Sequence, residues 1–140
     1  MNHFFRTSVF FRSIVFVVVY IIVAKLSLLL AFANSSASPV WPPTGMAIAF
    51  LAVTGWRAWP AVFIGAFVTN ITTQGTLFTS LAIAGGNTSE ALIGAWSMVW
   101  VVNNRHVVGT LFRFIVVLFC AAAPAAATLG VGSLWIARFV

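Results

Sequence analysis

Acidic residues are almost absent from this sequence. Glu90 is the only one in 140 residues, against seven lysines and arginines, and charged residues of both signs make up 6% of the chain. An average soluble domain is about a quarter charged. Hydrophobic residues make up 62% of the chain, and a small soluble domain cannot bury that much apolar surface, because its surface is large relative to its volume. The composition therefore predicts an integral membrane protein whose excess apolar surface faces lipid.

Other absences exclude whole classes of function. One acid cannot supply two-carboxylate catalysis, and the sequence has no phosphate-binding glycine loop, no H-E-x-x-H and no nucleophile elbow. Cys120 is the only cysteine and lies in an apolar run, which excludes a disulfide framework or a cysteine-based metal site. His3 and His106 are isolated, and the basic residues form no stripe that could follow phosphates. We predict no catalysis, no metal, no cofactor and no nucleic-acid partner.

Long apolar runs divide the chain into candidate membrane spans. A span needs roughly 20 apolar residues, and its backbone must pair internally because lipid offers no hydrogen-bond partner. Runs without period-two alternation favour helices over strands. The expected fold class is an all-α integral membrane protein, a polytopic transmembrane helix bundle of about five spans with a truncated sixth. The expected spans are 13–33, 42–56, 59–71, 77–102 and 107–129, with a sixth that begins near Gly132 and is cut short at Val140, as in a fragment.

The arginines predict an orientation. Pro42 and Pro43 suit the first turn of a helix, and Gly55 to Pro60 forms a turn whose two tryptophans and Arg57 suit a membrane surface. The positive-inside rule places the N-terminus, Arg57 and Arg105 in the cytoplasm, and loops 34–43 and 72–76 outside. A multi-pass protein of the bacterial plasma membrane is expected. Arg138 does not fit this map easily.

Two alternatives to this map stay open. Residues 42–71 are short for two spans and could form a re-entrant hairpin, although Arg57 would then lie at costly membrane depth. The N-terminal run could also be a cleaved signal, since Ala31-Phe32-Ala33 matches a cleavage site. Against cleavage, the run is longer than a usual signal core of about 7–15 residues and contains Lys25.

Two charged residues lie within the predicted spans. Such residues are expensive in lipid and indicate function by default. From helix rise, we expect Lys25 and Glu90 at similar depths on the first and fourth spans, close enough for an intramembrane ion pair that brings these helices together. The pair could fix packing only, or take part in sensing or proton-linked chemistry, or not form at all.

Residues 85–90 are the most polar stretch inside a predicted span. Gly85 and Gly86 are expected to loosen the helix, and polar residues through Glu90 should face inward. The stretch could bind a small polar ligand or an ion, or could simply allow close helix packing. The ligand-binding hypothesis covers Trp41, Asn70, Asn87 and Glu90.

The same residues have structural explanations. Trp41 could stack on a ligand or anchor the chain at the interface. Asn70 could contact a ligand or cap its helix. Ala61, Gly65 and Thr69 repeat every four residues, which favours a helix contact.

Several blocks resemble one known family. Residues 40–45 read Val-Trp-Pro-Pro-Thr-Gly, residues 55–60 read Gly-Trp-Arg-Ala-Trp-Pro, and residues 86–91 read Gly-Asn-Thr-Ser-Glu-Ala. Gly65 and Asn70 lie between the second and third blocks. Together these residues resemble the type-one MASE family of bacterial membrane-associated sensor domains. The residues carried over by the resemblance are Trp41, Pro42, Pro43, Gly45, Gly55, Arg57, Pro60, Gly65, Asn70, Gly86, Asn87 and Glu90.

The resemblance implies a sensory input domain that passes a cue to a cytoplasmic output, chiefly a histidine kinase or a diguanylate cyclase. The chain departs from the family by lacking an output domain and the second half of the membrane domain. We therefore expect a cytoplasmic N-terminus at 1–12 and an incomplete sensor-like domain at 13–140. Expected partners are the lipid bilayer, an unknown small ligand, the missing parts and a second copy in a homodimer.

Two rival functions remain. Short spans interrupted by glycine and proline, with polar groups at mid-membrane, are also typical of a small-molecule transporter or a transporter's substrate-binding subunit. A purely structural anchor predicts that residues 86–90 can be replaced by apolar residues without effect on an output.

Overall fold

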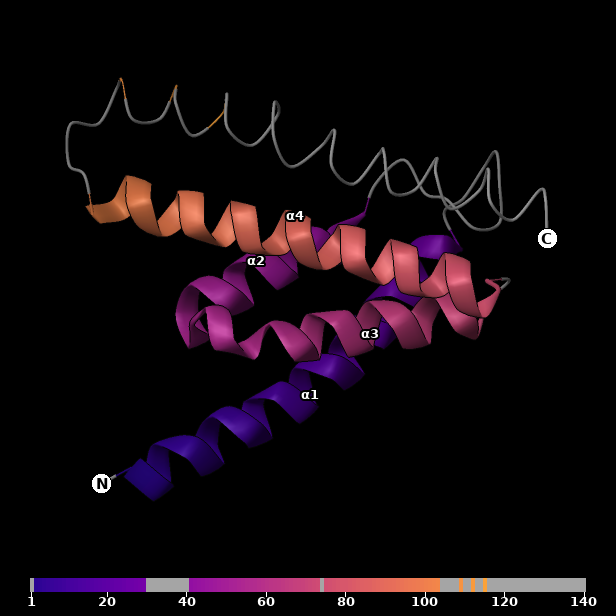
Figure 1. Ribbon diagram of the computed structural model, residues 1–140, viewed down its shortest axis with the longest axis horizontal. Helices are drawn as coiled ribbons and strands as arrows, with labels where there is room; N and C mark the ends of the chain where they lie inside the picture. The colour runs from indigo at the N-terminus through magenta and orange to yellow at the C-terminus, as the bar shows by residue number, and fades with distance from the viewer. Residues whose placement is uncertain are drawn as a thin grey trace.

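The structure is a computed structural model that describes residues 2–29, 41–73 and 75–103, together with three separate positions at 109, 112 and 115. Every regular element within these residues is helical (Figure 1). In chain order they are α1 (Asn2–Leu28), α2 (Pro42–Thr54), the short 3-10 helix η1 (Trp56–Ala58), α3 (Trp59–Ile71) and α4 (Leu77–Asn103). The predicted all-α class is therefore confirmed. The predicted sixth span lies outside the described residues, as does the predicted fifth except at those three helical positions.

The helix boundaries follow the sequence closely, with one exception. The predicted spans at 59–71 and 77–102 match α3 and α4 to within a residue. In contrast, the first helix begins at Asn2 rather than near residue 13. No proline or glycine interrupts the chain before Pro39, so nothing in the polar N-terminal segment stops the helix from extending. Its described end at Leu28 also falls before the predicted residue 33, in a region where residues 30–40 lie outside the described part.

Proline and glycine set the ends of the two short helices. Pro42 and Pro43 open α2, and Pro60 lies in the first turn of α3, where a missing N–H costs nothing. Gly55 ends α2 two residues before the predicted end, with φ +92° and ψ 157°. Residues with a side chain rarely adopt this conformation. The chain then reverses through η1, which carries Arg57, into α3.

Replacing Gly55 with alanine should destabilise the α2–α3 turn by about 1–3 kcal/mol, because alanine would hold a backbone conformation that only glycine adopts easily. Gly45→Ala is the matched control, since Gly45 is helical and an added Cβ would meet no atom within 4 Å. Thermal unfolding of the detergent-solubilised chain measures both. Equal melting temperatures for the two variants would contradict the assigned role of Gly55.

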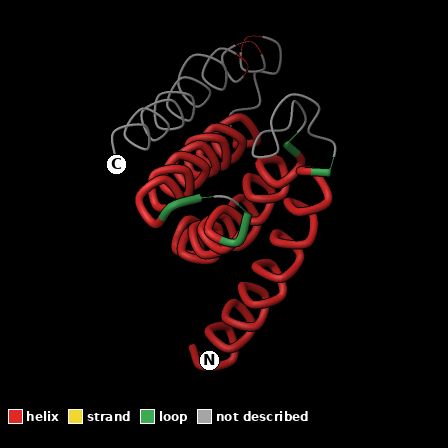
Figure 2. The backbone as a smooth tube through the Cα atoms, turned by 90° about the vertical axis from the view of Figure 1, so that its right-hand side faces the viewer, coloured by secondary structure: helices red, strands yellow, loops and turns green. Residues whose placement is uncertain are grey.

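The four α-helices pack side by side in the described part of the chain. α1 packs against α2 and α3, and α4 packs against the same two helices. The end-on view shows this grouping, with the N-terminal part of α1 diverging from the other helices (Figure 2). The packing of α1 through the buried Tyr20 and Ala24 favours its retention over cleavage as a signal.

The helix contacts are made by small side chains. The described core includes eight alanines and six buried serines and threonines, which allow backbones to approach closely. On α3, Ala61, Gly65 and Thr69 are all buried, as expected of a helix contact. A Cβ built on Gly65 would lie 3.0 Å from Tyr20 Cδ1, so α1 and α3 touch at this point.

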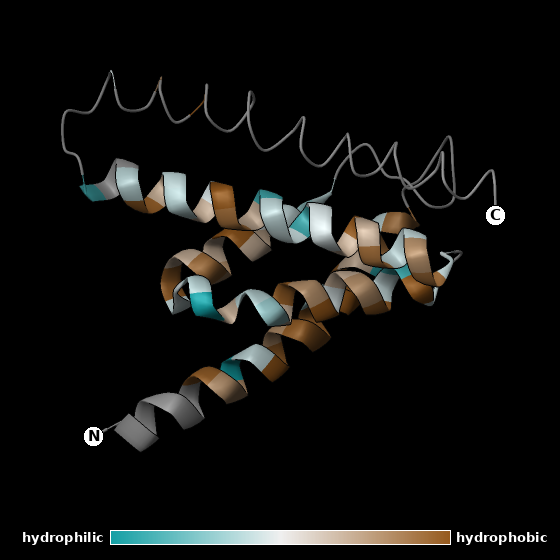
Figure 3. Ribbon diagram, in the orientation of Figure 1, coloured by the Kyte–Doolittle hydropathy of each residue, from teal (hydrophilic) through white to brown (hydrophobic). Residues whose placement is uncertain are grey.

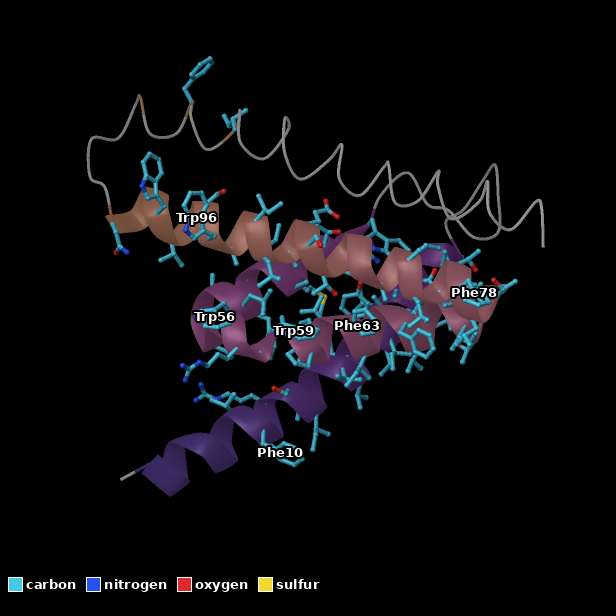
Figure 4. All side chains as sticks on the ribbon, in the orientation of Figure 1. Phe10, Trp56, Trp59, Phe63, Phe78 and Trp96 are labelled. Atoms are coloured by element: carbon cyan, nitrogen blue, oxygen red, sulfur yellow. The ribbon has the colours of Figure 1, made fainter. Side chains whose placement is uncertain are left out.

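The outer surface of the bundle is apolar. Phe10, Val18, Trp56 and Phe78 are each more than half exposed, and Figure 4 shows labelled aromatic side chains projecting from several helices. Hydrophobic colours also run along the C-terminal half of α1 and along α3 (Figure 3). Among the described residues, one helical segment, Val9–Leu28, is long and apolar enough to cross a membrane, and α2 is a shorter apolar helix. An apolar exterior around a core rich in small side chains is compatible with contact to lipid.

Candidate functional site

Side chains from three helices meet in the interior of the bundle. They form what we name the polar core cluster: Tyr20 of α1, Trp41 and Thr44 at the start of α2, and Asn87 and Glu90 of α4. Tyr20 is 1% exposed, and its hydroxyl faces the Asn87 side chain and the Trp41 indole. Glu90 also lies within electrostatic range of that hydroxyl. The cluster therefore links α1 to α4 across the bundle.

Aromatic packing fixes Tyr20 in this position. The Phe16 ring, one turn earlier on α1, stacks on Phe50 of α2 with ring centroids 4.0 Å apart. The Phe16 and Tyr20 rings lie 5.7 Å apart and tilted. On the other side, Tyr20 presses on Gly65 of α3. With its ring held between three helices, Tyr20 can direct its hydroxyl only toward α4.

Glu90 is half-buried and has a weak partner. Thr44 Oγ1 donates a hydrogen bond to Glu90 Oε2 at 3.4 Å, near the long limit for such a bond. Thr44 itself is held by the start of α2, where its backbone N–H donates to the Trp41 carbonyl at 3.2 Å. The chain's only acidic side chain thus has acceptor capacity left for another donor.

The Trp41 indole adds an unused donor. Its Nε1 is buried and makes no direct hydrogen bond to any residue in the described part of the chain, although it faces the Tyr20 hydroxyl. A buried N–H without a partner is costly and calls for an explanation. An unpaired indole donor beside an under-used carboxylate is an arrangement that can bind a small polar ligand or a water molecule.

The backbone around the cluster is regular, contrary to expectation. α4 runs without interruption from Leu77 to Asn103, so the predicted loosening at Gly85 and Gly86 is wrong. Thr88 donates to the Ala84 carbonyl at 2.7 Å within the same helix. Gly86 is buried, whereas a Cβ added at Gly85 would meet no atom within 4 Å. The continuous helix keeps Asn87 and Glu90 one turn apart on nearly the same face.

Lys25 and Glu90 do not form the predicted ion pair in this structure. Lys25 lies in the last turn of α1, where a cation interacts favourably with the helix dipole, and its Nζ donates to Thr73 Oγ1 at 2.7 Å. The depth estimate counted residues within each span, and such a count does not fix the register between two helices. Tyr20 is level with Asn87, so Lys25 lies about 7 Å further along α1, toward the α3–α4 turn and away from Glu90.

Asn70 belongs to that turn and not to the polar core cluster. Its side-chain Nδ2 donates to the Ala66 carbonyl at 2.8 Å. Its backbone carbonyl accepts from the N–H groups of Thr73 and Gly75, both at 3.1 Å. These bonds fit the expected role of a polar cap. The ligand-binding hypothesis for Asn70 therefore has no support from the arrangement, whereas Trp41, Asn87 and Glu90 do come together.

Two members of the cluster were missed from the sequence. Tyr20 is the only tyrosine in the chain, and a tyrosine amid aliphatic residues signals a hydroxyl that must find a buried partner. Thr44 stands one turn after Trp41, at the start of a proline-initiated helix. The unusual composition at Tyr20 could have revealed the first of these residues, but only the helix packing pairs Thr44 with Glu90.

Removing the Tyr20 hydroxyl should lower the free energy of unfolding by about 1–3 kcal/mol, because Tyr20→Phe leaves the Asn87 side chain without its partner in the interior. Phe16→Tyr, which adds a hydroxyl one turn away, is a control for changes in ring polarity. Thermal unfolding in detergent gives the values. If Asn87→Leu lowers stability by the same amount in the Tyr20→Phe background as in the wild type, the two side chains are not coupled.

The remaining residues carried over from the resemblance are structural in this arrangement. Pro43, Gly65 and Gly86 are buried in helix contacts, whereas Pro42, Gly45, Arg57 and Pro60 are exposed. The exposed four cluster around the ends of α2 and the start of α3, where they set helix boundaries. They do not contribute to the polar core cluster, which is built from Trp41, Asn87 and Glu90 of that set.

Comparison with known proteins gives one match. The family model of MASE1, a membrane-associated sensor domain, matches residues 12–140. Searches of curated proteins and of solved structures gave no significant match. MASE1 is a sensory input domain and not a catalytic one. The matched segment covers α1 from Arg12 onward, the other described helices and all five residues of the polar core cluster, so the chain belongs to the MASE1 family of membrane-associated sensor domains.

Proposed function

We propose that this chain detects a cue at the polar core cluster and passes it, by a change in helix packing, to a cytoplasmic signalling output such as a histidine kinase or a diguanylate cyclase. The observation that carries the proposal is the meeting of Tyr20, Asn87 and Glu90 from opposite helices inside an apolar bundle. A cue that binds one packing of these helices more tightly than another shifts the population toward it.

The cluster is suited to such a change because its bonds are few and weak. The Thr44–Glu90 hydrogen bond is long, and the Trp41 indole donor is unused. A ligand that offers an acceptor to Trp41 and a donor to Glu90 forms hydrogen bonds with both groups. It breaks at most the long Thr44–Glu90 bond. Since the cluster connects α1, α2 and α4, a rearrangement of its side chains changes how these three helices pack against one another.

Multi-pass insertion with a cytoplasmic N-terminus is part of the proposal. The apolar exterior supports lipid contact, and Arg12 and Arg57 share one end of the bundle, as the positive-inside rule favours. α2 and α3 are 13 residues each, or about 20 Å of helix. They suit tilted spans in a locally thinned bilayer, since shorter spans are tolerated at modest cost.

A deletion of the gene, complemented by the intact gene, tests the function. The readouts are cellular cyclic di-GMP and the phosphorylation of response regulators, measured across growth conditions. We expect the deletion to remove a condition-dependent change in one of these outputs and complementation to restore it. An unchanged response in both outputs would contradict the sensory proposal.

Uptake measurements in the same strains test the rival transporter function. The cluster's polar groups lie in the bundle interior, where transporters also bind substrate. Under the sensory proposal, deletion leaves the initial uptake rates of labelled amino acids, sugars and organic acids unchanged. A loss of uptake for one substrate, without any change in the two signalling outputs, would favour transport.

A further inference from the structure

Two contacts show that α1 and α3 run in the same direction with a fixed register. Tyr20 of α1 meets Gly65 of α3, and Lys25 of α1 meets Thr73 just after α3. Residue numbers rise together in these two contacts, so the helices are parallel. Eight residues before Tyr20 is Arg12, and eight residues before Gly65 is Arg57. Eight residues span about 12 Å of helix, which places both arginines at one end of the bundle and at a similar level.

Both arginines are exposed at this end. Arg12 and Arg57 are in the exposed class, and the first buried residue of α1 in the described part is Phe16. The N-terminal half of α1 also diverges from the other helices (Figures 1 and 2). The Arg57 guanidinium lies over the Trp56 ring, 5.6 Å from its centroid, which holds it at the tip of the α2–α3 turn.

The chain has no negative side chain that could neutralise this end. Glu90 is its only acidic residue, and it is bound by Thr44 near the start of α2. From Thr44 to the end of α2 at Thr54 is ten residues, or about 15 Å of helix rise, before the turn that carries Arg57. Two arginines at the same level without an acid therefore need an anion from outside the chain.

The neighbouring side chains indicate which kind of anion. Trp56 and Trp59 are 68% and 41% exposed, and Phe10 of α1 is 69% exposed. Figure 4 shows Trp56 and Trp59 at the α2–α3 turn, whereas Phe10 projects from the side of α1 that faces away from this turn. Exposed tryptophans are typical of the headgroup level of a bilayer, and a guanidinium binds phosphate with two parallel hydrogen bonds. A soluble anion would gain no binding energy from the exposed aromatic side chains beside the arginines.

We infer that Arg12 and Arg57 together bind the phosphate of an anionic phospholipid, whose glycerol and upper acyl segments lie against Trp56 and Trp59. The lipid supplies the charge that the sequence lacks at this end of the bundle. It also connects α1 to the α2–α3 turn where the two helices diverge. The inference is independent of the sensory function and requires only that this end lies at a membrane surface.

The test uses the full chain purified in a neutral detergent, with phosphatidylglycerol or phosphatidylcholine added. Native mass spectrometry measures bound lipid, and thermal unfolding measures the shift that each lipid causes. We expect phosphatidylglycerol to bind and to raise the melting temperature, and phosphatidylcholine to do so far less. Arg12→Gln and Arg57→Gln should each weaken phosphatidylglycerol binding about tenfold or more, as expected for the loss of a charge-assisted hydrogen bond.

Two further variants make the result specific. Lys25→Gln removes the cation at the other end of α1, where its partner is Thr73, and should leave the phosphatidylglycerol shift unchanged. Arg57→Lys keeps the charge and removes the two-pronged geometry, so an intermediate loss of binding is expected in a variant that folds. Wild-type binding by Arg12→Gln/Arg57→Gln, or an equal loss in Lys25→Gln, would overturn the inference.

A soluble phosphate distinguishes the lipid from its headgroup. Glycerol 3-phosphate at millimolar concentration should give no thermal shift, because it lacks the segments that contact the tryptophans. A shift equal to that of phosphatidylglycerol, abolished by the arginine substitutions, would mean a site for soluble phosphates and would refute the lipid assignment.

Discussion

Gly65→Leu is expected to force α1 away from α3 and to lower the free energy of unfolding by about 1–3 kcal/mol or more. A Cβ at Gly65 alone would lie 3.0 Å from Tyr20 Cδ1 and 3.1 Å from Cγ. Tyr20 cannot move aside easily, because its side chain is 1% exposed and its ring packs against Phe16. The added side chain must therefore separate the helices and move the Tyr20 hydroxyl away from Asn87 as well.

A series of substitutions identifies the cause. Gly65→Ala should cost less than Gly65→Leu, because a small shift of Tyr20 accommodates one methyl group. Gly85→Ala, where an added Cβ meets no atom within 4 Å, should be neutral or stabilising by up to about 1 kcal/mol. Thermal unfolding in detergent measures each variant. In a Tyr20→Ala background, Gly65→Leu should cost much less than in the wild type, and an unchanged cost would exclude Tyr20 as the obstacle.

The second large effect concerns signalling. Glu90→Gln keeps the size of the side chain and an oxygen that can accept from Thr44, but removes the only negative side chain of the cluster. We expect folded yield to stay near that of the wild type. The loss of one charge-assisted hydrogen bond to a cue corresponds to about 10–100-fold in affinity. The condition-dependent change in output should therefore largely disappear.

The measurement is the response of cyclic di-GMP or regulator phosphorylation across the growth conditions that the wild type distinguishes. Glu90→Asp, which keeps the charge on a shorter stem, should retain part of the response. Met98→Leu, an apolar change at an exposed position of the same helix, should retain all of it. A full response from Glu90→Gln at normal protein level would exclude a direct role for the carboxylate.

The sequence predicted the all-α class and most of the helix bounds in the described part of the chain. Apolar runs require helices, and prolines at Pro42 and Pro60 start helices where expected. Gly55 also falls at a helix end, as a glycine with positive φ would. These features depend on local chemistry, so one sequence is enough to find them.

The site was predicted in part, and the failures have a common cause. Trp41, Asn87 and Glu90 were identified as unusual residues and do come together, but the partner assigned to Glu90 was wrong. Pairing between helices depends on their register, which the Tyr20–Gly65 contact fixes for α1 and α3 and which no single run of residues reveals. In that register Lys25 lies five residues, or about 7 Å of helix rise, beyond Tyr20 and contacts Thr73.

Glycine had opposite roles that the sequence does not distinguish. Gly55 allows a sharp turn through its backbone, whereas Gly65 and Gly86 allow close packing within regular helices. Two consecutive glycines at 85 and 86 looked like a break, yet α4 continues through them because neighbouring helices pack against its buried face. Tertiary contacts thus override the low helix propensity of glycine.

The central claim is that these helices thread a bilayer, with the α2–α3 turn and the α3–α4 turn on opposite sides. Single cysteines at Trp56 and Thr72, both exposed in their turns, in a Cys120→Ser background, allow a direct measurement with a membrane-impermeant thiol reagent on intact cells. We expect the cysteine at Thr72 to be labelled from outside the cell, and the cysteine at Trp56 to be labelled only after the cells are opened. Labelling of both positions from the same side would contradict it.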